Sequence, residues 1–302
     1  MNASTADRAR YARRMALAIG LLGCATVPIP AQSLSYVGGL QYATGDFIFA
    51  QRTWSAYLSN GLVWSSGRLR ASASVPLVMQ PAGWLQYSGA GVVVPTGGMA
   101  GSGGTTSGTG GTMGSGGTMG SGMGGGTVTP ASGIPFSRVG IGDPIGRFDI
   151  LLAGNAADQR GVSAVGAIKA PLADVTSGFG TGRWDVGGGL SSAMSVGGMN
   201  LFAEAIYWQI GNPPGASLRN AVVYAMSAGR ALPHSRWSVV GSLSGASSLW
   251  SGLEGPVQAG TGVGYLLESG SSVFVTAAAG LTRTAPAIAT GIGWRVPLGS
   301  TR

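Results

Sequence analysis

The chain has few charged residues, a single cysteine, a single histidine and no long apolar run beyond its N-terminus. Only 9% of its 302 residues are charged, against roughly 25% in an ordinary soluble domain. A membrane-spanning helix needs roughly 20 consecutive apolar residues, and no segment after the N-terminus supplies them. These absences favour an all-β transmembrane barrel, because only helices and closed barrels satisfy every backbone polar group in lipid.

The scarcity of reactive side chains argues against an enzyme. His234, the only histidine, lies in a predicted turn over 233–235 with no local carboxylate to orient it as a base. No cluster of metal ligands is present, and the glycines of 260–264 are not followed by the Gly-Lys-Ser/Thr of a nucleotide loop. We therefore expect no catalytic residue, no cofactor and no metal. The formal charge of +8 includes no basic run, so we expect no nucleic-acid partner.

Residues 1–31 have the pattern of a secretory signal peptide. Four arginines between residues 8 and 14 precede an apolar stretch over 15–27, and a small-residue cleavage site ends at Ala31. Cleavage there would remove Cys24 and leave the mature chain, 32–302, without a thiol. An alternative is lipoprotein processing at Cys24, because residues 21–24 resemble a lipoprotein cleavage box; the intact mass of the mature protein separates the two.

Hydrophobic residues alternate with small or polar ones at a period of two, which is typical of strands and not of helices. In 68–79 the apolar face alternates with Arg68, Arg70 and serines, and 183–196 repeats the pattern with Arg183 and Asp185 on its polar side. We expect about twelve antiparallel strands, near 34–45, 53–64, 68–79, 139–152, 162–172, 183–196, 200–210, 220–231, 236–249, 257–268, 273–283 and 287–298. An even number is typical of bacterial single-chain barrels.

The connections between these strands have two different lengths. Those over 65–67, 156–161, 197–199, 232–235 and 269–271 are short and fall on one end, while those over 80–136, 174–182, 211–219 and 250–256 fall on the other. Short periplasmic turns and longer outer loops are typical of outer-membrane barrels.

The tryptophans divide between the same two ends and predict two interfacial girdles: Trp54, Trp184, Trp208 and Trp250 at the long-loop end, and Trp64, Trp237 and Trp294 at the short-turn end.

The loop over 80–136 has a low-complexity centre at 97–126, made almost wholly of Gly, Ser, Thr and Met. Such a composition buries too little apolar surface to offset chain entropy, so we expect this part to be disordered.

The polar faces of the strands predict which charges line the interior. We expect the lining set Arg68, Arg70, Arg147, Asp149, Lys169, Arg183, Asp185, Arg236 and Arg295. Arg147 with Asp149, and Arg183 with Asp185, are same-face neighbours that would cross-link the wall. The four arginines nearest the short turns, Arg68, Arg70, Arg236 and Arg295, would form a mouth that favours anions. The alternative is that these charges only stabilise the wall or the interface.

One strand conflicts with an outward apolar face. In 200–210, Glu204 has the same parity as Phe202, Ile206 and Trp208, so that face would carry a carboxylate into lipid. A bulge or a reversed face would resolve the conflict, and the sequence leaves both open.

Three motifs in the middle of the chain occur in a recognisable order: Gly140-Ile141-Gly142-Asp143, Lys169-Ala170-Pro171 and Gly180-Thr181-Gly182-Arg183-Trp184-Asp185. In this order and spacing they resemble the family of outer-membrane proteins of the phenol meta-degradation pathway. The chain departs from that family in having Leu172-Ala173 where Thr-Gly is usual. The resemblance implies a barrel that passes hydrophobic or aromatic compounds. It assigns strand-end and loop geometry to Asp143, Lys169, Pro171 and Asp185, with solute contact for Lys169 and Asp185.

The sequence therefore predicts a bacterial outer-membrane channel for passive uptake of small solutes, whose partners are outer-membrane lipid, the barrel-assembly machinery and the solute. A non-conducting structural or adhesive surface barrel is the alternative from a different class, and a secreted β-sandwich is the third. The sequence does not identify the solute, the oligomeric state, or whether the glycine-rich loop plugs the pore.

Overall fold

The computed structural model describes residues 32–46, 52–80, 85–87, 93–95, 138–155, 160–173, 179–212, 218–249 and 251–300. The predicted signal peptide, Cys24, the low-complexity segment 97–126 and Trp250 lie outside the described residues. Residues Gln32–Arg302 form one compact unit.

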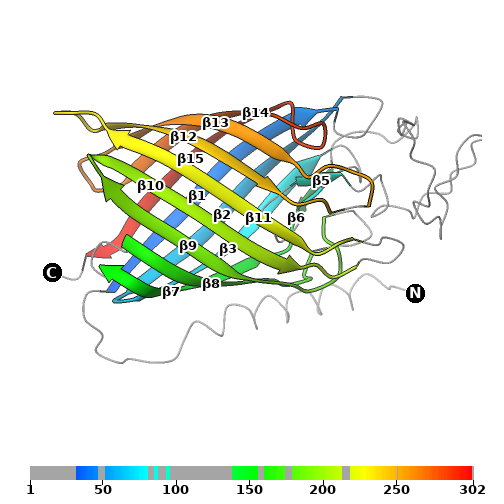
Figure 1. Cartoon of the computed structure of the whole chain (residues 1–302), viewed down its shortest axis with the longest axis horizontal. Helices are drawn as coiled ribbons and strands as arrows, with labels where there is room; N and C mark the ends of the chain where they lie inside the picture. The colour runs from blue at the N-terminus through cyan, green and yellow to red at the C-terminus, as the bar shows by residue number, and fades with distance from the viewer. Residues whose placement is uncertain are drawn as a thin grey trace, which may run out of the picture. The chain divides into compact units, whose positions relative to one another are not determined.

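Strands account for most of the described chain (Figure 1). They are β1 (Gln32–Gly45), β2 (Thr53–Ser66), β3 (Leu69–Gln80), β4 (Leu85–Tyr87), β5 (Val93–Pro95), β6 (Arg138–Ile141), β7 (Ile145–Asn155), β8 (Arg160–Lys169), β9 (Asp185–Val196), β10 (Met199–Gln209), β11 (Ala221–Ala231), β12 (Trp237–Ala246), β13 (Val257–Leu266), β14 (Ser272–Gly280) and β15 (Ile288–Ser300).

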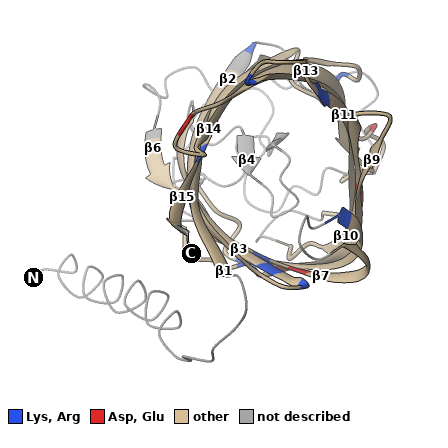
Figure 2. Ribbon diagram, turned by 90° about the vertical axis from the view of Figure 1, so that its left-hand side faces the viewer, with Lys and Arg blue, Asp and Glu red and all other residues tan. Residues whose placement is uncertain are grey.

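The main sheet is antiparallel throughout and closes on itself. Each strand from β7 to β15 pairs with its neighbours in chain order, β15 pairs with β1, and β2 joins β1 to β3. The viewing direction of Figure 2 lies close to the axis of the resulting ring. On its second edge β3 pairs with two consecutive strands, the short β6 against Leu77–Gln80 and then β7 against Leu69–Ser74. Because β6 and β7 together occupy one position, the thirteen strands of the sheet form a twelve-stranded barrel, as predicted.

The interruption between β6 and β7 is a departure from the continuous strand expected over 139–152. Proline has no N–H to donate to a ladder, and Pro144 stands just before β7. Asp143 turns into the barrel at this break and is buried. β8 likewise ends at Lys169, earlier than expected, because Pro171 follows it.

The two ends of the barrel differ as the sequence indicates. Between β9 and β10 only Gly197 and Gly198 form the turn, and both have positive φ, 57° and 78°. Two consecutive residues with positive φ are the requirement of a type I′ hairpin turn, which matches the twist of antiparallel strands. The connections at the other end are longer, with β8 and β9 separated by residues 170–184.

Most large apolar residues of β3 and β9 face outward. Val186, Leu190 and Met194 alternate along β9 and are all exposed, as are Leu69, Val75, Leu77 and Met79 along β3. Large apolar side chains that stay exposed on a closed barrel form the surface that lipid would cover. The outward face predicted for these two strands is confirmed.

No helix among the described residues is long and apolar enough to cross a membrane.

Candidate functional site: the inner wall

The inner wall carries a charged network that joins β7 to β10, two strands that are not adjacent in the sheet. Arg147 and Asp149 lie on the inner face of β7, and their side chains form an ion pair of 2.6 Å. The same Arg147 guanidinium reaches Glu204 of β10 at 2.5 Å. Because β8 and β9 lie between β7 and β10 in the sheet, this second bridge passes over two strands on the inner side.

Glu204 therefore faces inward, which resolves the conflict found in the sequence. The apolar face of β10 is reversed relative to that of β9. Ile206 and Trp208 are buried on the inner side of the sheet, while Tyr207 is exposed on the outer side. Opposite these side chains, β9 has Gly187 and Gly189 in register with Trp208 and Ile206. A Cβ on Gly187 would lie 2.8 Å from the Trp208 ring, so the glycine makes room for the indole.

Trp208 consequently does not belong to the interfacial girdle in which the sequence placed it. It is one of a set of buried apolar residues on the inner wall of β8, β10 and β11 and the adjoining loops: Val165, Ala167, Ile206, Trp208, Ile210, Ala221 and Leu249. Parity alone could not reveal this cluster, because an apolar face was assumed to be the outer one. The Gly187-Gly188-Gly189 run opposite it was the available signal.

The four arginines predicted to form one mouth have different environments. Arg68 donates from Nη1 to the carbonyl oxygens of Leu151 (3.4 Å) and Leu152 (3.2 Å), where the β7–β8 register shifts. Arg236 forms an exposed ion pair of 3.0 Å with Glu268. These two arginines are occupied by contacts at the short-turn end.

Arg70 and Arg295, in contrast, are exposed on the inner wall. Arg295 donates from Nε to the buried Ser35 hydroxyl at 3.1 Å. Among the described residues neither arginine forms an ion pair. Arg70 lies in register with Asp149 on β7 and is in electrostatic range of both Asp149 and Arg295. Of the predicted mouth, Arg70 and Arg295 carry the two guanidinium groups that remain open to the lumen.

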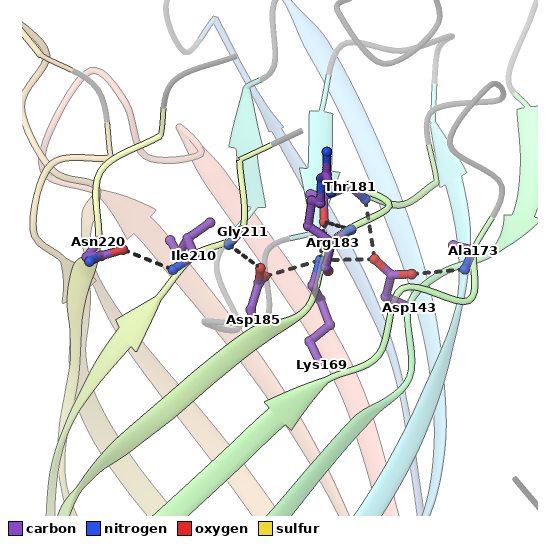
Figure 3. Close-up of polar contacts among 9 residues, drawn as sticks. All are labelled: Asp143, Lys169, Ala173, Thr181, Arg183, Asp185, Ile210, Gly211 and Asn220. Atoms are coloured by element: carbon purple, nitrogen blue, oxygen red, sulfur yellow. Dashed lines mark hydrogen bonds and ion pairs between the residues drawn. The ribbon is translucent and has the colours of Figure 1, made fainter. Parts of the chain in front are cut away.

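The three sequence motifs converge on one buried cluster beneath the longer loops (Figure 3). Lys169, the last residue of β8, places its Nζ 3.0 Å from Asp143 Oδ2 and 3.1 Å from Asp185 Oδ2. It also donates to Thr181 Oγ1 at 2.5 Å. Lys169 and Asp185 have no exposed surface, so neither side chain contacts solute in this conformation, unlike the role that the family resemblance implied.

Backbone amides complete this cluster. Asp143 accepts hydrogen bonds from the amide nitrogens of Ala173 (2.9 Å) and Thr181 (3.3 Å), and Asp185 accepts one from Gly211 (2.9 Å). Two carboxylates face one ammonium group, and these N–H donors stabilise the extra negative charge. The cluster thus connects the β6–β7 break, the β8–β9 loop and the start of the β10–β11 loop.

The glycines of the motifs pack against the same cluster. A Cβ on Gly180 would lie 2.8 Å from Asp143 Oδ1, and one on Gly140 would lie 2.3 Å from the Phe179 ring. Gly142 lies against Pro76, and Gly182 has a φ of 67°. Pro171 stands in the loop that Ala173 and Thr181 anchor. The motif glycines Gly140, Gly142 and Gly180 thus lie in tight contacts around this cluster.

The ion pair predicted between Arg183 and Asp185 is not among the ion pairs of the described residues. The backbone of Arg183 contacts Thr181 Oγ1, with the carbonyl at 3.3 Å and the amide at 3.4 Å, and the residue is exposed. Asp185, its expected partner, forms its ion pair with Lys169 across the β8–β9 register. Within the described ranges no three His, Cys, Asp or Glu residues gather as metal ligands would.

No protein-family model matches the chain, and no curated protein matches it in sequence. Among solved structures, it is similar to an outer membrane channel from Pseudomonas putida F1, with a TM-score of 0.55 and 10% identity over 90% of this chain and 97% of that one. It is also matched by the CymD monoaromatic hydrocarbon channel, with a TM-score of 0.42 and 10% identity over 91% and 90% of the two chains. A third match, the β domain of the Bordetella autotransporter BrkA, has a TM-score of 0.41 and 12% identity over 88% and 99%. The first of these likenesses shows the fold, a closed barrel of the outer-membrane kind.

Proposed function

We propose that the chain is an outer-membrane channel through which small solutes diffuse passively. The observation that carries this proposal is the contrast between the two faces of one closed sheet. The outer face exposes large apolar side chains, whereas the inner face carries Arg70, Arg147, Asp149, Glu204 and Arg295. Charges on the lumen side set the ionic preference of such pores, and a wall built only for packing would not need open arginines.

The solute class is a further part of this proposal. The motif resemblance favours hydrophobic or aromatic compounds. The proposal includes removal of residues 1–31 on export, assembly by the barrel-assembly machinery and contact of the outer belt with lipid.

A non-conducting surface barrel is the second candidate. The ion pair between Arg147 and Glu204 and the buried residues around Trp208 favour this candidate, because both fill part of the barrel interior that a solute would need.

Liposome swelling separates the two candidates. The refolded protein is inserted into liposomes, and swelling is followed in isotonic solutions of sugars of increasing size. A channel gives swelling rates that fall with solute size. A barrel that inserts fully, judged by protease protection, but gives no swelling for the smallest sugar would contradict the channel.

A further inference from the structure

We infer that the inner wall holds a binding site for small carboxylates with an apolar body, formed by Arg295 and Phe274 and reinforced by Arg70. This inference rests on the proposed function, because it names the class of solute that the lumen would recognise. It depends on side chains from β14, β15 and β3 that share the inner face.

The cationic part of the site is Arg295. Its Nε is oriented by the hydroxyl of Ser35, which is buried on β1. The two terminal nitrogens of the guanidinium form no hydrogen bond or ion pair among the described residues, and a planar guanidinium matches a carboxylate in two parallel hydrogen bonds. An arginine placed this way and left without an ion pair among the described residues is suited to bind an anion.

The apolar part is Phe274, an inward-facing aromatic residue that is 46% exposed. It pairs in register with Gly293, and a Cβ on that glycine would lie 2.0 Å from the ring tip. The ring therefore extends across Gly293 on the face where Arg295 follows two residues later. On a strand, side chains at i and i+2 share one face, so Arg295 and Gly293, which the Phe274 ring covers, lie on the same inner face.

The surrounding charges favour an anion at this place. Arg70 of β3 lies in electrostatic range of Arg295, although the charge of Asp149, its register partner on β7, acts on it more strongly. An anion bound at Arg295 would reduce the repulsion between the two arginines. The acidic groups of the inner network are already engaged, since Asp149 and Glu204 both contact Arg147. The three arginines Arg70, Arg147 and Arg295 outnumber the two carboxylates, so the net charge of this part of the inner wall is positive.

The ligand class follows from the two parts together. A carboxylate binds the guanidinium, and a flat apolar body packs on the open Phe274 ring, as stacked and edge-on aromatic contacts do. Benzoate has both features, while acetate has only the first. A neutral aromatic compound has only the second.

The experiment measures block of ionic current through the refolded protein by benzoate and by acetate. The variants are Arg295→Gln, Phe274→Ala and Arg70→Gln, with Arg283→Gln as the charge-matched control on the exposed β14–β15 loop. We expect benzoate to block at lower concentration than acetate. Arg295→Gln should weaken block by both anions about tenfold or more, the scale of a charge-assisted hydrogen bond. Phe274→Ala should abolish the advantage of benzoate, and Arg283→Gln should change neither.

Equal benzoate block in the parent, Arg295→Gln and Arg283→Gln would overturn the site while leaving the channel in place. Absence of any current from inserted protein would instead count against the proposed function. In that event calorimetric titration of benzoate into the refolded protein in detergent decides the inference. Saturable binding that Arg295→Gln removes supports the site, and no binding, or binding that survives the change, rejects it.

Discussion

The buried cluster around Lys169 and the open arginines of the lumen place the same kinds of charge in opposite environments. Lys169 has no exposed surface and contacts two carboxylates and a hydroxyl. Arg70 and Arg295 are exposed and have no ion pair among the described residues. Burying a charge is tolerated only with partners for it, so the first group is committed to holding loops in place. The second group keeps its charge available, which is what recognition of a solute requires.

The largest effect should come from removing the central cation of the buried cluster. Lys169→Met leaves Asp143 and Asp185 buried without their counter-charge, and breaking a buried pair in this way costs about 3–5 kcal/mol. We expect the urea midpoint for unfolding in detergent micelles to fall accordingly. Adding Asp143→Asn to Lys169→Met should recover part of the loss. If the single variant is as stable as the parent protein, the cluster does not hold the loops.

A smaller effect is expected where the β9 glycines accommodate the inner apolar cluster. Gly187→Ala should destabilise the barrel by about 1–3 kcal/mol, the range for overpacking a tight site, because the new methyl group meets Trp208. Gly188→Ala is the matched control: this neighbouring glycine faces outward and a Cβ there contacts nothing within 4 Å. Thermal unfolding of both variants measures the difference. Equal stability would mean that Trp208 does not rest on β9.

The inner network should affect ion preference more than stability. Glu204→Gln removes one negative charge from the lumen, so the reversal potential in a salt gradient should shift towards anions. Arg147→Gln removes one positive charge, and the shift should be towards cations. A shift of the same sign in both variants would contradict an inner-wall position for this ion pair.

The smallest effect is expected at the exposed rim. Arg236 and Glu268 form a 3.0 Å ion pair with side chains that are 46% and 83% exposed, and exposed pairs contribute about 0.2–1 kcal/mol. Arg236→Gln should therefore leave the urea midpoint close to that of the parent protein. A loss comparable to that of Lys169→Met would show that burial does not separate the two kinds of pair.

The alternation along the strands could be predicted from the sequence, because successive side chains of a strand point to opposite faces of the sheet. The twelve positions in the barrel and the outward faces of β3 and β9 follow from residues two apart. For β10 the same rule pointed outward along Trp208 and Ile206, yet the structure turns these residues inward. The reason lies on another strand, where Gly187 and Gly189 leave space for them.

The buried cluster around Lys169 could be predicted from the sequence only in part. Asp143, Lys169, Thr181 and Asp185 were singled out by motif order, but nothing in their spacing shows that one ammonium group joins two carboxylates. That contact depends on the register between β8 and β9 and on the break before β7. The different environments of the four predicted mouth arginines likewise depend on contacts distant in sequence, such as the hydrogen bond from Arg68 to the carbonyl oxygen of Leu151.

The central claim of the proposal, that solutes pass through the lumen and that Arg70 and Arg295 give it an anion preference, is tested most directly by single-channel recording under a salt gradient. The parent protein is compared with the Arg70→Gln, Arg295→Gln double variant in planar bilayers. The account predicts stable current steps with an anion preference that the double variant loses. Stable insertion without current, or an ionic preference that the double variant leaves unchanged, would contradict it.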